Sequence, residues 1–117
     1  MSGGAAGAVG VAVAQFAPTA DERANLAVID ELTARAAERG ARVVLFPEYA
    51  SYFVDPFDET LAAHAQDLDG AFTRALRDCA RRHGVVIVAG LVERAGGGRV
   101  RNAVVAVDGD RVLAAYR

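Results

Sequence analysis

The chain has 117 residues, of which 53% are hydrophobic and 24% are charged, and its formal net charge is -2. This composition is typical of a globular protein, and the length suits one domain with a modest core. No apolar run reaches the roughly 20 residues of a membrane span, and the basic residues form no stripe suited to nucleic acid.

All 13 basic residues are arginine, so no lysine-based chemistry can come from these residues. The single cysteine, Cys79, excludes an internal disulfide, and with two histidines at unrelated positions we expect no metal site and no cofactor. Residues 1–8 are small and apolar without a basic segment, which argues against a secretory signal. We therefore expect a flexible N-terminal tail over 1–8 and a cytoplasmic protein.

The first predicted elements are a strand and a helix. Residues 9–16, VGVAVAQF, are typical of a buried strand. Apolar residues then recur at helical spacing, which predicts a helix over about 20–39 that ends at Gly40. Thr19 and Glu22 have the spacing of a capping box, so we expect Thr19 to cap this helix.

The middle of the chain predicts a second strand and two more helices. RVVLF, at 42–46, is a continuous apolar run of the kind found in strands covered on both faces. Residues 47–57 are rich in proline and aromatic residues and predict a loop. A short helix is expected within 58–66, and a clear helix over 71–83 ends at Gly84.

The last segments predict three strands. VVIVAGLVE at 85–93 is a buried run, and residues 100–107 and 111–116 are joined by a strong hairpin signal at 108–110. The order predicts an α/β fold with a mixed sheet and two main helices. Two helices cover only one face of such a sheet, so the other apolar face needs a second sheet or a partner.

Glu48 is the main candidate for chemistry, because it follows directly after a predicted buried strand and Pro47. Ligands of open α/β sheets bind beyond the carboxyl ends of the strands, and apolar neighbours suit a carboxyl group to general acid or base catalysis. The structural alternative is a solvated glutamate at a strand end or a helix cap.

Tyr49, Tyr52 and Phe53 lie in the same predicted loop. Aromatic residues beside an acid are common in the walls of substrate pockets and equally common as core anchors, so both interpretations stay open. Cys79 lies on the apolar face of the helix over 71–83, which indicates an inert packing residue. His83 precedes the end of that helix, and His64 has no partner at a recognisable spacing.

These segments together resemble the N-terminal part of the nitrilase superfamily, the carbon–nitrogen hydrolases. The resemblance spans residues 9–117 and rests on VAVAQFAP, NLAVIDELTARAAERGARVVLFPE, ARRHGVVIVAGLVER and RNAVVAVDGDRVLAAYR. It implies the N-terminal half of an αββα sandwich, in which two sheets pack face to face with helices outside.

The resemblance also implies a hydrolase acting on carbon–nitrogen bonds other than peptide bonds through a Glu-Lys-Cys triad. It places the glutamate on Glu48, as the general base for the cysteine thiol. It implies a small amide or nitrile as the substrate, with an amide preferred, and a homo-oligomer for the complete protein.

The family's lysine is expected directly after Tyr116-Arg117, and its cysteine further on. We therefore expect residues 9–117 to be an incomplete carbon–nitrogen hydrolase domain in a truncated chain, and the 117-residue chain alone to be inactive. The alternative is a non-catalytic α/β fragment that acts, if at all, by association.

Overall fold

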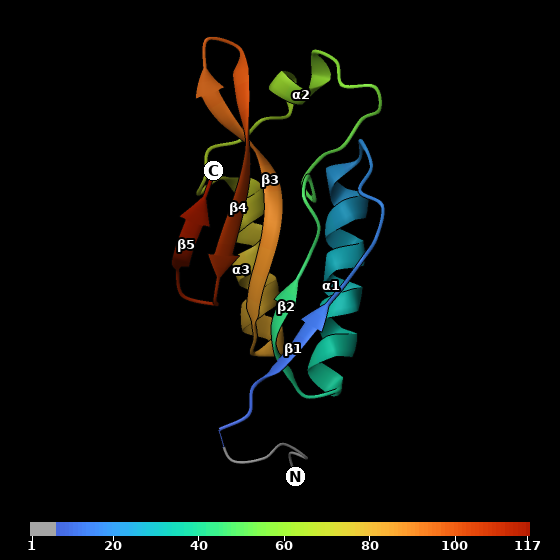
Figure 1. The fold of residues 1–117 in the computed structure, drawn as a ribbon, viewed down its shortest axis with the longest axis vertical. Helices are drawn as coiled ribbons and strands as arrows, with labels where there is room; N and C mark the ends of the chain where they lie inside the picture. The colour runs from blue at the N-terminus through green and yellow to red at the C-terminus, as the bar shows by residue number, and fades with distance from the viewer. Residues whose placement is uncertain (1–6) are drawn as a thin grey trace.

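A computed structural model describes residues 7–117, so most of the predicted tail over 1–8 lies outside the described residues. The described chain contains five strands and three helices (Figure 1). In chain order these are β1 (Gly10–Val13), α1 (Glu22–Glu38), β2 (Ala41–Leu45), α2 (Thr60–Ala63), α3 (Ala71–His83), β3 (Val86–Gly96), β4 (Arg99–Val107) and β5 (Val112–Tyr116).

The strands form one sheet in the order β1-β2-β3-β4-β5. The first three are parallel and the last two pairings are antiparallel, which confirms the predicted mixed α/β sheet. The predicted hairpin at 108–110 is also confirmed. The Asp108 carboxylate accepts hydrogen bonds from the backbone amides of Asp110 (2.7 Å) and Arg111 (2.9 Å), which fixes the turn.

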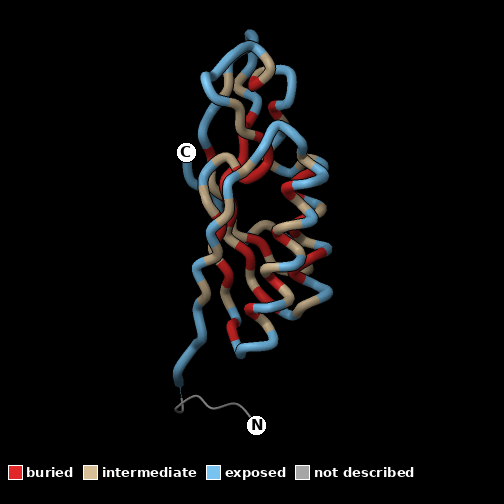
Figure 2. The backbone as a smooth tube through the Cα atoms, turned by 90° about the vertical axis from the view of Figure 1, so that its right-hand side faces the viewer, coloured by how far each residue is buried: buried red, intermediate tan, exposed pale blue. Residues whose placement is uncertain are grey.

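Both long helices lie against the same face of the sheet, as the side-on view in Figure 2 shows. Their buried side chains, including Ile29, Phe72 and Leu76, form the main core with Ile87 and Leu91 of β3. Gly84 ends α3 in the left-handed conformation (φ 66°), as the sequence predicts.

The opposite face of the sheet, called here the open face, carries an apolar row that crosses all five strands. Strand register places Val13, Leu45, Val88, Ala106 and Ala114 side by side in that order. Val13 is 72% exposed, because no helix of residues 7–117 covers this part of the face. The expectation that two helices leave one face open is therefore confirmed for the described chain.

The upper part of the same side is covered by the segment between β2 and α3. Tyr52, Leu61 and Ala65 form a second, smaller core with Val92 of β3. In Figure 1 this segment, with α2, lies beside the protruding β3–β4 hairpin. Within residues 7–117 no helix combines the length and apolarity needed to cross a membrane.

The N-terminal cap of α1 differs from the prediction. Asp21, and not Thr19, is the cap residue, and its Oδ1 accepts a hydrogen bond from the Ala24 amide at 3.1 Å. The Thr19 hydroxyl instead accepts from the Asp21 amide at 3.2 Å. Thr19 and Asp21 are both favoured cap residues. The helix begins at Glu22, directly after Asp21, so the capping-box prediction was wrong.

Candidate active site

Glu48 lies just past the last backbone hydrogen bond between the β2 segment and β3. The Phe46 amide donates to the Val88 carbonyl (2.8 Å), and the Gly90 amide donates to the Pro47 carbonyl (3.1 Å), so backbone pairing continues past the end of β2. Glu48 comes next and is exposed. It therefore sits beyond the carboxyl ends of parallel strands, where open α/β sheets bind ligands.

Gly90 lets the backbone around Glu48 approach β3 closely. A Cβ atom on Gly90 would lie 2.6 Å from the Cα of Glu48 and 2.8 Å from the amide nitrogen of Tyr49. Only glycine leaves room for this contact. Tyr49 itself has a φ of 55°, a left-handed conformation that is uncommon for a bulky residue and that occurs preferentially at functional sites.

The side chain of Glu48 is held by β4. The amide Nδ2 of Asn102 donates a hydrogen bond to Glu48 Oε2 at 2.6 Å. Asn102 was not among the residues that the sequence pointed to. Its signal was present in the strand alternation, because Asn102 shares a face with Val100 and Val104 and is the polar member of that apolar series.

A cavity of about 430 Å³ adjoins Glu48. Tyr49 and Phe53 line it together with Glu48, and the centroids of the two aromatic rings are 5.9 Å apart. The remaining lining residues are Ala17, Pro18 and Pro47. The site thus combines one carboxylate with mostly apolar walls, an arrangement typical of small-molecule pockets.

Tyr52 lies apart from that cavity. It is 3% exposed, its ring stacks on His64 at a centroid distance of 4.1 Å, and its hydroxyl donates to Thr60 Oγ1 at 2.7 Å. The structure therefore brings Glu48, Tyr49 and Phe53 together and places Tyr52 in the smaller core. His64, for which the sequence offered no partner, packs on Tyr52.

Cys79 lies in the helix layer, on the side of the sheet away from the open face. It is 3% exposed, and burial raises the pKa of its thiol to about 11, which agrees with a packing role. Its Sγ lies 3.4 Å from Asp30 Oδ1, an oxygen that also bonds to Arg82 (2.6 Å) and His83 (3.0 Å).

The ligand-type atoms of Asp30, Cys79 and His83 all lie within 4.8 Å of one another. The Arg82 guanidinium occupies the shared Asp30 oxygen and, with His83, lowers the pKa of that carboxyl to about 2. The group therefore works as an ion-pair network, called here the Asp30 network, that joins α1 to α3.

A buried acid that the sequence did not single out, Glu93, lies on β3. Its carboxylate accepts two hydrogen bonds of 2.7 Å from the Arg117 guanidinium, and this pairing lowers the pKa of Glu93. Bidentate pairing satisfies the buried carboxylate and fixes Arg117 against the sheet.

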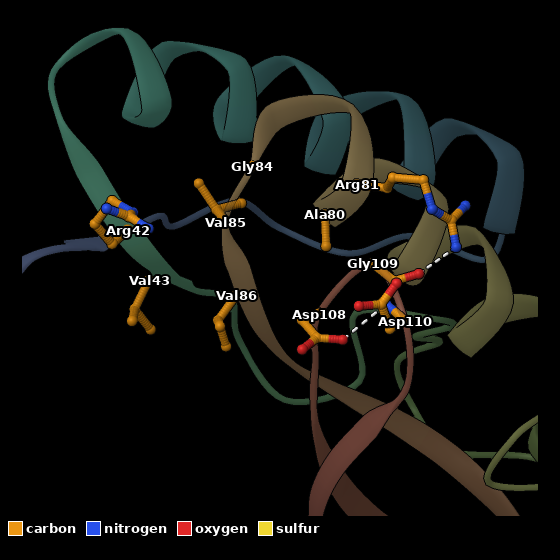
Figure 3. A pocket seen from close by; sticks show the side chains of 10 residues that line it. All are labelled: Arg42, Val43, Ala80, Arg81, Gly84, Val85, Val86, Asp108, Gly109 and Asp110. Atoms are coloured by element: carbon orange, nitrogen blue, oxygen red, sulfur yellow. Dashed lines mark hydrogen bonds between the residues drawn. The ribbon is translucent and has the colours of Figure 1, made fainter.

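A second cavity, of about 420 Å³, lies at the other end of the sheet (Figure 3). It is formed by the starts of β2 and β3, the end of α3 and the turn at 108–110. Arg81 crosses its wall and donates to the Gly109 carbonyl. None of the sequence-predicted site residues lines this cavity. The candidate active site is therefore the cavity at Glu48.

The family model for carbon–nitrogen hydrolases matches residues 10–117. A hydrolase of Mycobacterium tuberculosis is 31% identical over 96 residues, which cover 82% of this chain and 33% of that protein. A probable hydrolase, nit2, of Schizosaccharomyces pombe is 30% identical over 76 residues, or 65% of this chain and 28% of that protein. The chain thus spans about a third of the length of the curated relatives it matches.

Solved structures of an amidase from Nesterenkonia sp. AN1, of the nitrilase superfamily, share the fold. A mutant showing Michael addition of acrylamide at the active-site cysteine matches with a TM-score of 0.79 and 29% identity, over 94% of this chain and 44% of that chain. A mutant in complex with butyramide matches with a TM-score of 0.75 and 30% identity, over 92% of this chain and 41% of that chain.

Proposed function

Since this chain belongs to the carbon–nitrogen hydrolase family, we propose that it carries the general base of an enzyme that hydrolyses a small amide, and that this base is Glu48. The observation that carries the proposal is the position of Glu48 beyond the carboxyl end of β2, in the wall of an apolar cavity. A carboxylate in such a place suits proton transfer to and from a bound reactant.

In the proposed reaction, Glu48 accepts the proton of a cysteine thiol, and the thiolate attacks the amide carbon. A lysine stabilises the oxyanion that forms. When the carbon–nitrogen bond breaks, Glu48 returns the proton to the leaving amine and a thioester remains. Water then attacks the thioester, giving up a proton to Glu48, and Glu48 passes this proton to the departing cysteine sulfur as the carboxylic acid is released.

The lysine and the cysteine are proposed to lie in sequence beyond Arg117. The chain contains no lysine, and Cys79 is buried in the helix layer away from Glu48. The pairing of β4 with β5 supports this position for the lysine. Val104 lies opposite Tyr116 in an antiparallel register, so continuing this register by two residues would place the residue after Arg117 opposite Asn102, the partner of Glu48.

A small linear amide is the proposed substrate class. The cavity of about 430 Å³ is open to a small molecule, and the related amidase has been captured with butyramide and with acrylamide. The open face supports the same picture, because a second sheet contributed by later residues would bury it, as the αββα sandwich requires. Assembly of the complete protein into a homo-oligomer is part of the proposal.

The first experiment reads the coding sequence beyond Arg117. A lysine as the next residue, followed downstream by a cysteine that opens a helix, would agree with the proposal, and a stop codon there would contradict it. In the full-length protein, Glu48→Gln should keep the thermal unfolding temperature and abolish amide turnover. Turnover near that of the wild type would remove Glu48 from the role of general base.

A second candidate function is non-catalytic association through the open face. Val11 and Val13 are 60% and 72% exposed on that face, and Tyr116 is 78% exposed, so residues 7–117 offer an apolar surface to a partner. A genuine stop codon after Arg117 together with a stable complex of the 117-residue chain would favour this function over hydrolysis.

A further inference from the structure

We propose that Asn102 is a positioning residue, which holds the carboxylate of Glu48 in the orientation needed for proton transfer. The inference rests on the proposed function of Glu48 as a general base. The observation that supports it is the 2.6 Å hydrogen bond from Asn102 Nδ2 to Glu48 Oε2. Asn102 bonds to the reacting group and has no described contact with the cavity, so it acts through Glu48.

Strand register explains why Asn102 reaches this carboxylate. Val104 pairs with Gly90, and Asn102 pairs with Val92, so Asn102 and Gly90 are diagonal neighbours on one face of the β3–β4 ladder. Gly90 admits the Glu48 backbone to within van der Waals contact of β3. The glycine therefore sets the height of Glu48 over the sheet, and the asparagine sets the direction of its side chain.

The side-chain amide of Asn102 is a suitable hydrogen-bond partner for a general base at Glu48. A primary amide donates a hydrogen bond without a positive charge, whereas an arginine at this position would favour the ionised carboxylate and weaken it as a proton acceptor. The bond occupies Oε2. Within the described part of the chain no other group donates to this carboxylate, so Oε1 remains able to take up the proton of a nucleophile.

Asn102 is an exposed polar residue in an otherwise apolar row of β4. The residues before and after it on the same face, Val100 and Val104, are half-buried and apolar. A third apolar residue would extend that surface, and only the bond to Glu48 uses the amide. The described role of this amide is therefore the bond to the Glu48 carboxylate.

The test measures kcat and KM for a small linear amide in the full-length protein. Asn102→Leu keeps the side-chain size and removes the donor, and we expect kcat to fall by about 100-fold while KM changes little, because misplacing a catalytic group by about 1 Å costs this much. Asn102→Gln keeps the amide on a longer stem, and we expect it to restore part of the lost kcat.

Asn102→Asp places a second carboxylate beside Glu48, so its kcat should fall most at the higher pH values, where both acids are ionised. Arg99→Gln, at an exposed residue on the same strand, is the matched control and should leave both constants unchanged. The thermal unfolding temperature of each variant is measured alongside, and Asn102→Asp supplies the test if Asn102→Leu does not fold.

The outcomes separate this inference from the proposed function. If Glu48→Gln is inactive while Asn102→Leu and Asn102→Asp both keep the wild-type kcat, the positioning role is overturned and the role of Glu48 stands. If Glu48→Gln is active, the proposed function itself is wrong. Loss of kcat in Asn102→Leu with partial recovery in Asn102→Gln supports the inference.

Discussion

Glu48 is fixed at two levels, by its backbone and by its side chain. The Gly90 amide bonds to the Pro47 carbonyl immediately before it, and Asn102 bonds to its carboxylate. Tyr49 then turns the chain through a left-handed conformation, φ 55°, toward the cavity. The Glu48 side chain is thus held in place by a hydrogen bond although it is exposed in residues 7–117.

Gly90→Ala tests the backbone part of this arrangement. The new Cβ would lie 2.6 Å from the Cα of Glu48, so the segment must move, and we expect the free energy of unfolding to fall by about 1–3 kcal/mol. Urea denaturation of the full-length protein measures this loss. Because Glu48 moves with the segment, amide turnover should fall as well.

Gly84→Ala is the control for Gly90→Ala. Gly84 has a φ of 66° and open space around it, so alanine there should cost about 1–2 kcal/mol through backbone strain alone. It should lose stability and keep turnover per folded molecule. Equal turnover in both variants would show that the close contact at Gly90 does not position Glu48.

Among the elements, α1 and α3 are joined by the Asp30 network as well as by apolar packing. Arg82 and His83 lower the pKa of Asp30 to about 2, below the value of about 3.9 for an unfolded chain. The network therefore contributes stability above about pH 3.9, and this contribution is lost as the pH falls toward 2. Its side chains are partly exposed, so solvent screening keeps the contribution small.

Urea midpoints measured between pH 6 and pH 2 test the Asp30 network. We expect Asp30→Asn to lower the midpoint at pH 6 and to make it converge with that of the wild type near pH 2, since the missing charge no longer matters there. Asp78→Asn removes an exposed partner of Arg81 within α3 and serves as the control. A constant difference between Asp30→Asn and wild type at every pH would contradict the assigned role.

The elements themselves were largely predictable, because their apolar spacing and their glycine stops are local signals. The helix over 71–83 was predicted at its observed bounds, and Gly84 ends it as expected. The strand predicted over 85–93 ends at Gly96 instead, since its last residues are held by pairing with β4 and not by their own pattern. The length of β3 depends on its pairing with β4, which the sequence of the β3 segment alone does not show.

The candidate site was predictable only in part for the same reason. Glu48 follows a recognisable strand, so local sequence was enough to find it. Asn102 lies 54 residues away and meets it only through the sheet register, and Gly90 shows its purpose only when the crossing segment is in place. Tyr49, Tyr52 and Phe53 could not be separated by sequence, because the direction of each side chain depends on the folded loop.

At the scale of the whole molecule, the described chain has one covered face and one open face. The helices bury the first, while the apolar row from Val13 to Ala114 crosses the second. An exposed apolar surface of this kind binds hydrophobic dyes and promotes association. We therefore expect the isolated 117-residue chain to self-associate.

Val13→Glu tests this expectation by placing a charge within the apolar row. Dye fluorescence and sedimentation of the 117-residue chain should both show less association in this variant than in wild type. Phe57→Ser is the control, because Phe57 is a large apolar residue, 56% exposed, that lies in the loop between β2 and α2 and outside the apolar row of the strands. A monodisperse wild-type chain that binds no dye would contradict the assignment of an exposed apolar surface.

The one-sided core also bears on biosynthesis. Residues 7–117 contain both long helices and the five strands of the described sheet, so under the proposed function this part emerges first and can pack its covered face early. Translation proceeds at about 5–20 residues per second, so under the proposed function the apolar row would stay bare until the second sheet emerges. Transiently exposed apolar surface of this kind is prone to aggregation during synthesis.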